Sequence, residues 1–237
     1  MTTLTHSLDK LRSLEIIDFR SFDHIPIHIV GMGAVGSKIF EQLITLGGRN
    51  IVIHDADIVE GHNLHNQLYI AEDVGKPKTT AALDWFSRKY DVDPETTLVK
   101  ESNAWVTKDT PLEGIVLLAV DTFDGRRIIS QAAHDQRKCP LVIEGRCAPT
   151  FTEVRSFNPF MAIDLEKFLG SLGSDEDADP YLSICGLPIS FSPVMTQCAI
   201  MMSMILVSFL KYNTLLPQHK CMRFLSDPML TLGVNEL

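Results

Sequence analysis

Apolar runs and helical spacing alternate along the first part of the chain. Short runs of β-branched and apolar residues predict buried strands, and apolar residues three or four positions apart predict the helices between them. The predicted strands are 27–30, 51–54, 97–99, 114–120 and 140–144, and the predicted helices are 37–46, 79–90 and 126–133. This rhythm is typical of an open α/β domain, a mostly parallel sheet with helices on both faces.

The pattern changes after Arg146. The later elements that we expect are an antiparallel strand over 150–157, a mobile acidic loop over 171–180, an apolar helix over 194–211 and strand-like residues at 221–225. A short helix over 8–19 belongs to an N-terminal segment, residues 1–24. We therefore predict one domain over 25–237, whose late strands form an antiparallel C-terminal extension of the sheet.

Composition narrows the function classes. Of the 237 residues, 45% are hydrophobic and 22% charged, as in a soluble globular protein, and the net charge of −9 argues against a dedicated nucleic-acid binder. The apolar stretch 198–210 is shorter than the ~20 residues of a membrane span, and no secretory signal opens the chain. We expect a cytoplasmic protein with no nucleic-acid or membrane partner. Its five cysteines form no CxxC pair, which predicts reduced thiols and no structural zinc.

A glycine-rich loop joins the first strand to the first helix. Gly31, Gly33 and Gly36 have the GxGxxG spacing, and Asp55 ends the next predicted strand. Small residues let the backbone approach a phosphate at a helix N-terminus, and a carboxylate at the second strand accepts hydrogen bonds from a ribose. The motif predicts a nucleotide site without separating NAD from ATP.

A dense polar block, residues 55–78, follows this loop. The residues in it that could contact a nucleotide are Asp55, Asp57, His62, Asn63, His65, Asn66, Gln67, Lys76 and Lys78. Amide donors and lysines suit a polyphosphate better than a nicotinamide ring.

These motifs resemble those of the ThiF/MoeB family, adenylating enzymes related to ubiquitin-activating enzymes. The family has a glycine loop followed by D-x-D-x-V-x-x-S-N-L-x-R-Q and G-x-P-K. The corresponding residues here are Asp55-Ala-Asp57-Ile-Val59, then His62-Asn63-Leu64-His65-Asn66-Gln67, then Gly75-Lys76-Pro77-Lys78. Asp121 and Arg126 resemble the family's aspartate and arginine after a later strand, and the apolar helix resembles the family's late helix.

The resemblance implies a Rossmann-like ThiF/MoeB-type fold and a function. Family members use Mg-ATP to transfer AMP to the C-terminal glycine of a ubiquitin-like or sulfur-carrier protein, and release pyrophosphate. The resemblance implies that Asp55 holds the ribose, that Asp57, Asn63 and Gln67 shape the phosphate pocket, that Lys78 neutralises phosphate charge and that Asp121 places Mg²⁺. We also predict a homodimer, formed through the late apolar helix.

The family pattern breaks at Asn66, where the family has arginine. Asparagine brings no charge, so one phosphate contact is missing. Three outcomes are open: Arg126, Arg127 or Lys76 replaces the missing arginine, the protein is a slower or divergent adenylating enzyme, or it binds nucleotide without turnover. In many family members an N-terminal arginine reaches the partner's site, and Arg12 and Arg20 are the candidates here.

One cysteine has a functional interpretation. Cys185 stands near the place of the cysteine that takes part in sulfur transfer or a thioester in some relatives; a small buried residue is the other interpretation. Hydrogen bonding to nucleotide is the better interpretation of His62 and His65, which lack a third metal ligand of clear spacing.

Two other function classes stay open. The first is an NAD(P)-dependent oxidoreductase, which the glycine loop and Asp55 fit, although no hydride-transfer site stands out. The second is a non-catalytic nucleotide-binding or scaffold subunit, which Asn66 favours. Preferential binding of NADH would support the first, and tight ATP binding without turnover would support the second.

Overall fold

A computed structural model describes residues 16–93, 97–176, 190–213 and 218–223. Its strands are β1 (Ile27–Val30), β2 (Ile51–His54), β3 (Lys100–Ser102), β4 (Ile115–Leu118), β5 (Leu141–Ala148), β6 (Phe151–Phe157) and β7 (Gln218–Arg223). Its α-helices are α2 (Gly36–Thr45), α3 (Lys78–Tyr90), α4 (Phe123–Gln136), α5 (Ala162–Gly170) and α6 (Ser192–Tyr212). Three short 3₁₀ helices are η1 (Phe19–Phe22), η2 (Gly61–His65) and η3 (Ala71–Asp73).

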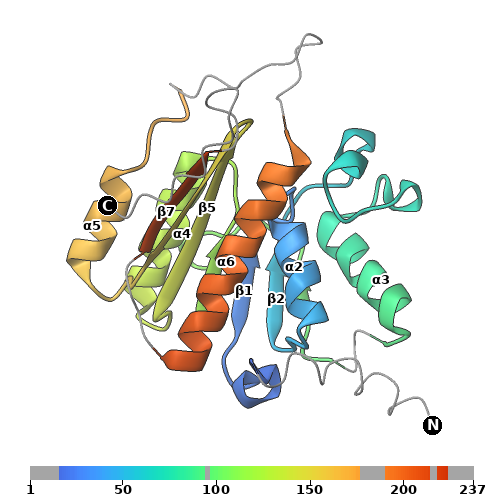
Figure 1. The fold of residues 1–237 in the computed structure, drawn as a ribbon, viewed down its shortest axis with the longest axis horizontal. Coiled ribbons are helices and arrows are strands. Elements are labelled where there is room, and N and C mark those ends of the chain that lie inside the picture. Colours follow the sequence, from blue (N-terminus) through green and yellow to red (C-terminus); the bar gives the residue numbers. More distant parts are fainter. Residues whose placement is uncertain (1–15, 94–96, 177–189, 214–217, 224–237) are drawn as a thin grey trace.

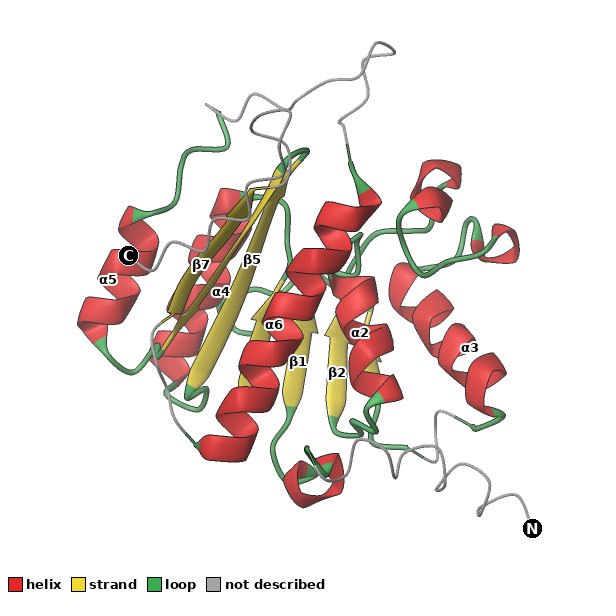
Figure 2. Ribbon diagram, viewed as in Figure 1, coloured by secondary structure: helices red, strands yellow, loops and turns green. Residues whose placement is uncertain are grey.

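The strands form one seven-stranded sheet in the order β3-β2-β1-β4-β5-β6-β7 (Figure 2). The first five strands in this order are parallel, and β6 and β7 pair antiparallel at the end of the sheet. The predicted mostly parallel sheet with an antiparallel C-terminal extension is therefore confirmed.

Helices cover both faces of the sheet (Figure 1). Alternate residues of the central strands enter two cores, because successive side chains of a strand point to opposite faces. Ile29 and Leu117 belong to the core that includes α2, α3 and α6, whereas Val30 and Leu118 belong to the core that includes α4 and α5. Both faces are buried, which explains why these strands are apolar without alternation.

Element boundaries differ from the prediction where polar residues take part in regular structure. Helix α4 begins at Phe123, not at 126, because Thr122 caps it by accepting a hydrogen bond from the Gly125 N–H at 3.2 Å. Strand β5 continues to Ala148 because it pairs with β6, and β3 lies at Lys100–Ser102 instead of 97–99. Helix α5 was not predicted; it is nine residues long and buries only Leu165 and Phe168.

Helix α6 is longer than the apolar stretch suggested. It spans 21 residues, and its most apolar 18-residue window has a mean hydropathy of 1.8, so by length and composition alone it is long enough and apolar enough to cross a membrane. Half of its apolar window is buried in the protein, where it packs against β5, β6 and α2. Gly145 of β5 makes this approach possible, since a Cβ there would lie 2.6 Å from the sulfur atoms of Cys198 and Met202.

Two histidines stack inside the sheet at β1 and β2. The Glu113 N–H donates to Nε2 of His28 at 3.3 Å, so Nδ1 of His28 carries the proton and donates it to Nε2 of His54 at 2.9 Å. Burial lowers the pKa of each imidazole from 6.5 to about 4. The fold therefore holds both rings neutral.

This pair predicts acid sensitivity. Between pH 6.5 and about 4 the unfolded state binds more protons to these imidazoles than the folded state, so the unfolding free energy falls as the pH is lowered through this range. We expect about 2 kcal/mol less unfolding free energy at pH 5 than at pH 7.5 for one such imidazole. Urea unfolding at both pH values measures the difference, and the double variant His28→Gln/His54→Gln should lose much of this pH dependence. An unchanged dependence in the variant would contradict the assignment.

Candidate nucleotide-binding site

The predicted site residues follow three neighbouring strands at one edge of the sheet. Gly31 follows β1, Asp55 follows β2, and Asp121 lies three residues beyond the end of β4. Because β1, β2 and β4 are parallel, their carboxyl ends share one edge. In the sheet, β2 lies on one side of β1 and β4 lies on the other, so the order of the strands reverses at β1. The carboxyl ends of the strands at such a switch point are where α/β proteins bind ligands.

Glycine stands at the three loop positions for different structural reasons. Gly31 has φ +92°, and a Cβ there would lie 2.6 Å from the Ala119 carbonyl oxygen. A Cβ on Gly36 would collide with the carbonyl of Gly31. A Cβ on Gly33 would meet nothing within 4 Å. Gly31 and Gly36 therefore shape the loop, and Gly33 leaves open space beside the N-terminus of α2, as a phosphate cradle requires.

Asp55, the first residue of the polar block, accepts hydrogen bonds from both the glycine loop and the polar block. Its Oδ2 accepts a hydrogen bond from the Met32 N–H at 2.6 Å, and its Oδ1 accepts one from the Asp57 N–H at 2.8 Å. Burial raises the pKa of this carboxyl, whereas Lys78 and the two N–H groups lower it. Each oxygen keeps a second lone pair, which suits acceptance of the ribose hydroxyls.

Lys78 is the first residue of α3 and is almost buried, with 8% of its surface exposed. Its Nζ lies 2.7 Å from Oδ2 of Asp57, and its N–H donates to the Asp57 carbonyl at 2.9 Å. Backbone and side chain thus hold one cation beside the segment that follows β2.

The amides of the polar block divide into two kinds. Asn63 is structural here, because its Oδ1 accepts the Glu60 N–H at 2.9 Å and closes the first turn of η2. Asn66 donates from Nδ2 to the Ser190 hydroxyl at 2.6 Å, across 124 residues of sequence. Within the described part of the chain, the buried Oδ1 of Asn66 and Oε1 of Gln67 have no hydrogen-bond partner. These two oxygens could accept hydrogen bonds from a ligand.

The cations suggested as replacements for the missing arginine have carboxylate partners elsewhere. Lys76 lies 3.2 Å from Asp73 and 2.6 Å from Asp84, and Arg127 lies 2.9 Å from Asp124. Arg20, the described one of the two N-terminal candidates, pairs with Asp18. Arg12 lies outside the described residues.

Arg126 is buried behind the site. Its Nη2 donates to the carbonyls of Val120 at 2.5 Å and Gly145 at 3.2 Å, and its Nε lies 3.1 Å from the fully buried Glu144. Arg146 lies 2.8 Å from the same carboxylate. Burial raises the pKa of Glu144 and the two guanidinium groups lower it. These contacts give Arg126 a bracing position between the end of β4 and β5.

Substitution of Glu144 should have a large effect on stability. Glu144→Gln keeps the shape of the side chain but leaves Arg126 buried without a counter-charge, so we expect a loss of about 3–5 kcal/mol in unfolding free energy. The matched control is Glu41→Gln, which removes an exposed pair with Lys89 and should cost less than about 1 kcal/mol. Equal unfolding midpoints in urea for the two variants would contradict the role of Glu144.

Asp121 is exposed at the edge where the predicted phosphates would lie. Among the described residues, no group of three or more histidine, cysteine, aspartate or glutamate side chains could hold a metal ion. A single carboxylate nevertheless fits Mg²⁺, which protein sites bind through one or two carboxylates together with substrate phosphates. The residues present therefore suit a magnesium ion that arrives with a nucleotide.

Sequence reasoning missed three residues that organise this site. Tyr69 and Asp73 lie in the polar block but carried no motif, and Glu144 was assigned only to a strand. Apolar flanks are the one signal for Tyr69, and nothing local marks Glu144 as a partner of two arginines. Cys185 lies outside the described residues, and His62 is an exposed partner of Glu60 at 3.1 Å.

Comparisons with known proteins show the family of the chain. The sequence model of the ThiF family matches residues 18–228. The chain is 36% identical over 114 residues to a sulfur carrier protein ThiS adenylyltransferase of Bacillus subtilis, covering 44% of this chain and 32% of that protein. It is 32% identical over 111 residues to a sulfur carrier protein adenylyltransferase of Thermus thermophilus, covering 44% and 40%.

Solved structures agree with the fold. The crystal structure of PaaA superposes with a TM-score of 0.68 at 18% identity, covering 97% of this chain and 68% of that one. Escherichia coli MccB with ATP superposes with a TM-score of 0.67 at 16% identity, covering 92% and 65%. The curated relatives are matched over only 25% to 40% of their own length. With a family match across most of its length and the expected sheet, the chain belongs to the ThiF family.

Proposed function

We propose that the protein uses ATP to adenylate the C-terminal carboxylate of a ubiquitin-like or sulfur-carrier protein. The observation that carries the proposal is that the glycine loop, Asp55 and the Lys78–Asp57 pair lie together at one edge of the sheet. In the reaction, a carboxylate oxygen of the carrier attacks the α-phosphorus of ATP. The new C–O–P linkage forms as the bond from the α-phosphorus to the bridging oxygen breaks, and pyrophosphate leaves with the electron pair.

The protein contributes positioning and electrostatics to this transfer. Asp55 holds the ribose, the α2 N-terminus and the backbone around Gly33 receive phosphate oxygens, and Lys78 neutralises charge that grows on the leaving group. Asp121 and the nucleotide phosphates would hold Mg²⁺, which supplies further charge neutralisation when bound. The unpartnered oxygens of Asn66 and Gln67 would accept hydrogen bonds from substrate.

The direct test measures ATP–pyrophosphate exchange by the purified protein with Mg²⁺ and a panel of ubiquitin-fold carriers that end in glycine. We expect exchange and a carrier–AMP adduct, detected by mass spectrometry, with at least one carrier. Absence of both with every carrier, in protein shown to bind ATP, would reject adenylation of such carriers.

One observation favours a second function, nucleotide binding without turnover. Asn66 stands where the family has arginine, and its Nδ2 is already bonded to Ser190. If this function is correct, the protein binds ATP but shows no exchange, and Asn66→Arg does not restore it. ATP–pyrophosphate exchange by the wild-type protein would instead support the adenylating enzyme.

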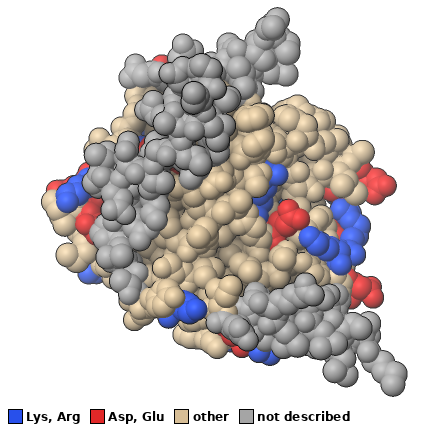
Figure 3. All heavy atoms as spheres, in the orientation of Figure 1, with Lys and Arg blue, Asp and Glu red and all other residues tan. Residues whose placement is uncertain are grey.

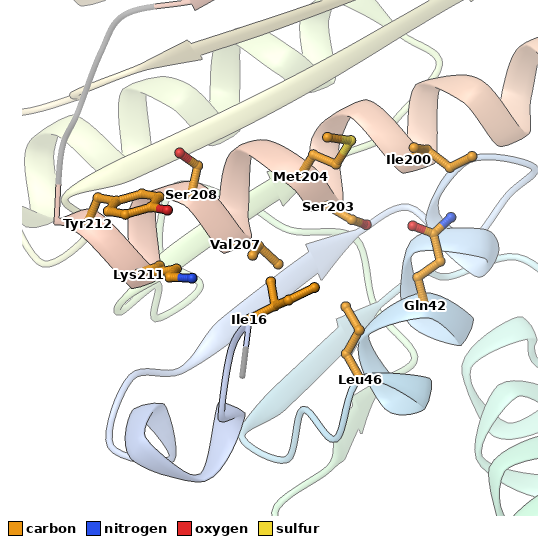
Figure 4. Close-up of a pocket in the computed structure, with 10 residues that line it drawn as sticks. All are labelled: Ile16, Gln42, Leu46, Ile200, Ser203, Met204, Val207, Ser208, Lys211 and Tyr212. Carbon is orange, nitrogen blue, oxygen red and sulfur yellow. The ribbon is translucent and has the colours of Figure 1, made fainter. Parts of the chain in front are cut away.

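We also propose a homodimer through α6. One side of α6 and the adjoining Ile16 leave apolar side chains exposed, with Met204 and Tyr212 more than 60% exposed. Figure 4 shows them around a groove of about 330 Å³ between α6 and α2, and Figure 3 shows few charged side chains over this face. A helix face of this kind pairs with its own copy across a twofold axis, which buries both apolar surfaces.

Light scattering after size exclusion tests the dimer, with an expected mass of twice 26.5 kDa. Met204→Glu should shift the mass to that of one chain. Ile128→Glu, a charge placed at a half-exposed apolar position on the helix of the other face, should leave it unchanged. A monomeric wild-type protein would reject the proposal.

A further inference from the structure

Tyr69 lies between η2 and η3 in the polar block, and only 3% of its surface is exposed. Its hydroxyl donates a hydrogen bond of 2.7 Å to the carbonyl of Met32, 37 residues earlier in the chain. Met32 is the residue between the first two glycines of the loop and is itself fully buried. One side chain of the polar block therefore reaches into the turn that is expected to carry the phosphates.

Met32 is held at both ends of its backbone. Its N–H donates to Asp55 at 2.6 Å, and its carbonyl accepts from Tyr69. The preceding residue, Gly31, donates its N–H to the carbonyl of His54 at 2.9 Å. These three bonds restrain the first part of the loop, whereas Gly33 has free space around it.

The tyrosine is suited to remain a donor. Burial raises its pKa well above 10, and the nearby carboxylates of Asp55, Asp73 and Asp57 raise it further, so the hydroxyl keeps its proton at neutral pH. Its ring belongs to the core under α2, α3 and α6, so a phenylalanine would fill the same space. Only the bond to Met32 would be lost.

We propose that Tyr69 is a positioning residue that holds the glycine loop in the shape that receives a nucleotide. The consequence for affinity rests on the proposed function of the site, whereas the effect on the loop does not. Without the hydroxyl, the carbonyl of Met32 lacks its donor and the loop samples other conformations. Nucleotide binding must then order it again.

Tyr69→Phe tests this inference, with Tyr90→Phe as the matched control. Tyr90 ends α3, where its hydroxyl lies 3.3 Å from that of Thr45. We expect Tyr69→Phe to weaken ATP binding about 3- to 10-fold in calorimetry without carrier, and to speed amide hydrogen exchange of residues 32–37 in the free protein. The control should change neither, and the KM for carrier should stay constant.

The outcomes separate the two proposals. If Tyr69→Phe left the amide hydrogen exchange of residues 32–37 unchanged, the positioning role would be overturned, even if the melting temperature fell. Unchanged affinity for ATP in a protein that binds ATP would also overturn it. A wild-type protein that binds no ATP would reject the proposed function instead, and the exchange measurement would still decide the role of Tyr69.

Discussion

Lys78→Met should lower kcat/KM for ATP about 10²- to 10³-fold, the effect of removing one preorganised charge from a reacting group. Methionine keeps the unbranched stem of the buried side chain and removes only the ammonium. The half-exposed Asp57 then loses its partner, but water can solvate it, so the unfolding free energy should change by less than about 1 kcal/mol. The loss should therefore fall on activity and leave the fold intact.

Pyrophosphate exchange and thermal unfolding together check this expectation. Lys89→Met is the matched control, because it removes a surface lysine that pairs with Glu41 outside the site. If Lys78→Met kept the exchange rate of the control, Lys78 would not act on the phosphates. If both activity and melting temperature collapsed, its contribution would be structural.

Two glycine variants should give opposite patterns of stability and binding. Gly33→Ala places a methyl group in open space, so the melting temperature should stay near that of the wild type. That space is where the backbone would approach the phosphates, and losing one or two charge-assisted hydrogen bonds should weaken ATP binding about 10- to 100-fold.

Gly36→Ala should instead destabilise the protein by about 1–3 kcal/mol, because its Cβ would collide with the carbonyl of Gly31. Helix propensity alone predicts the reverse, since alanine is better than glycine in a helix by about 1 kcal/mol. Melting temperature and ATP titration distinguish the variants. A stable Gly36→Ala protein with full affinity for ATP would contradict the close contact between position 36 and the carbonyl of Gly31.

The sheet and the nucleotide loop are predictable from sequence because their signals are local. Residues 27–36 contain a strand, three spaced glycines and a helix start within ten positions. Asp55, which directly follows β2, lies about twenty positions further on. Apolar runs also mark β4 and β5, although they leave out the polar end of β5 that pairs with β6.

The interactions that organise the site are not local. Asn66 meets Ser190 across 124 residues, and Tyr69 meets Met32 across 37. Arg126 was one candidate to replace the missing arginine of the phosphate site, yet the fold pairs it with Glu144. Only the order of the strands brings β4 beside β5 and so decides which charges meet.

The glycine at position 145 limits how this protein can be re-engineered. Glycine inside a strand ordinarily weakens it, but here two sulfur atoms of α6 fill the space of the absent side chain. The side chains at positions 145, 198 and 202 therefore share one volume, so the size of one limits the size of the others. A larger residue at 145 displaces these sulfur atoms, so we expect it to be tolerated best when it is combined with a smaller residue at 198 or 202.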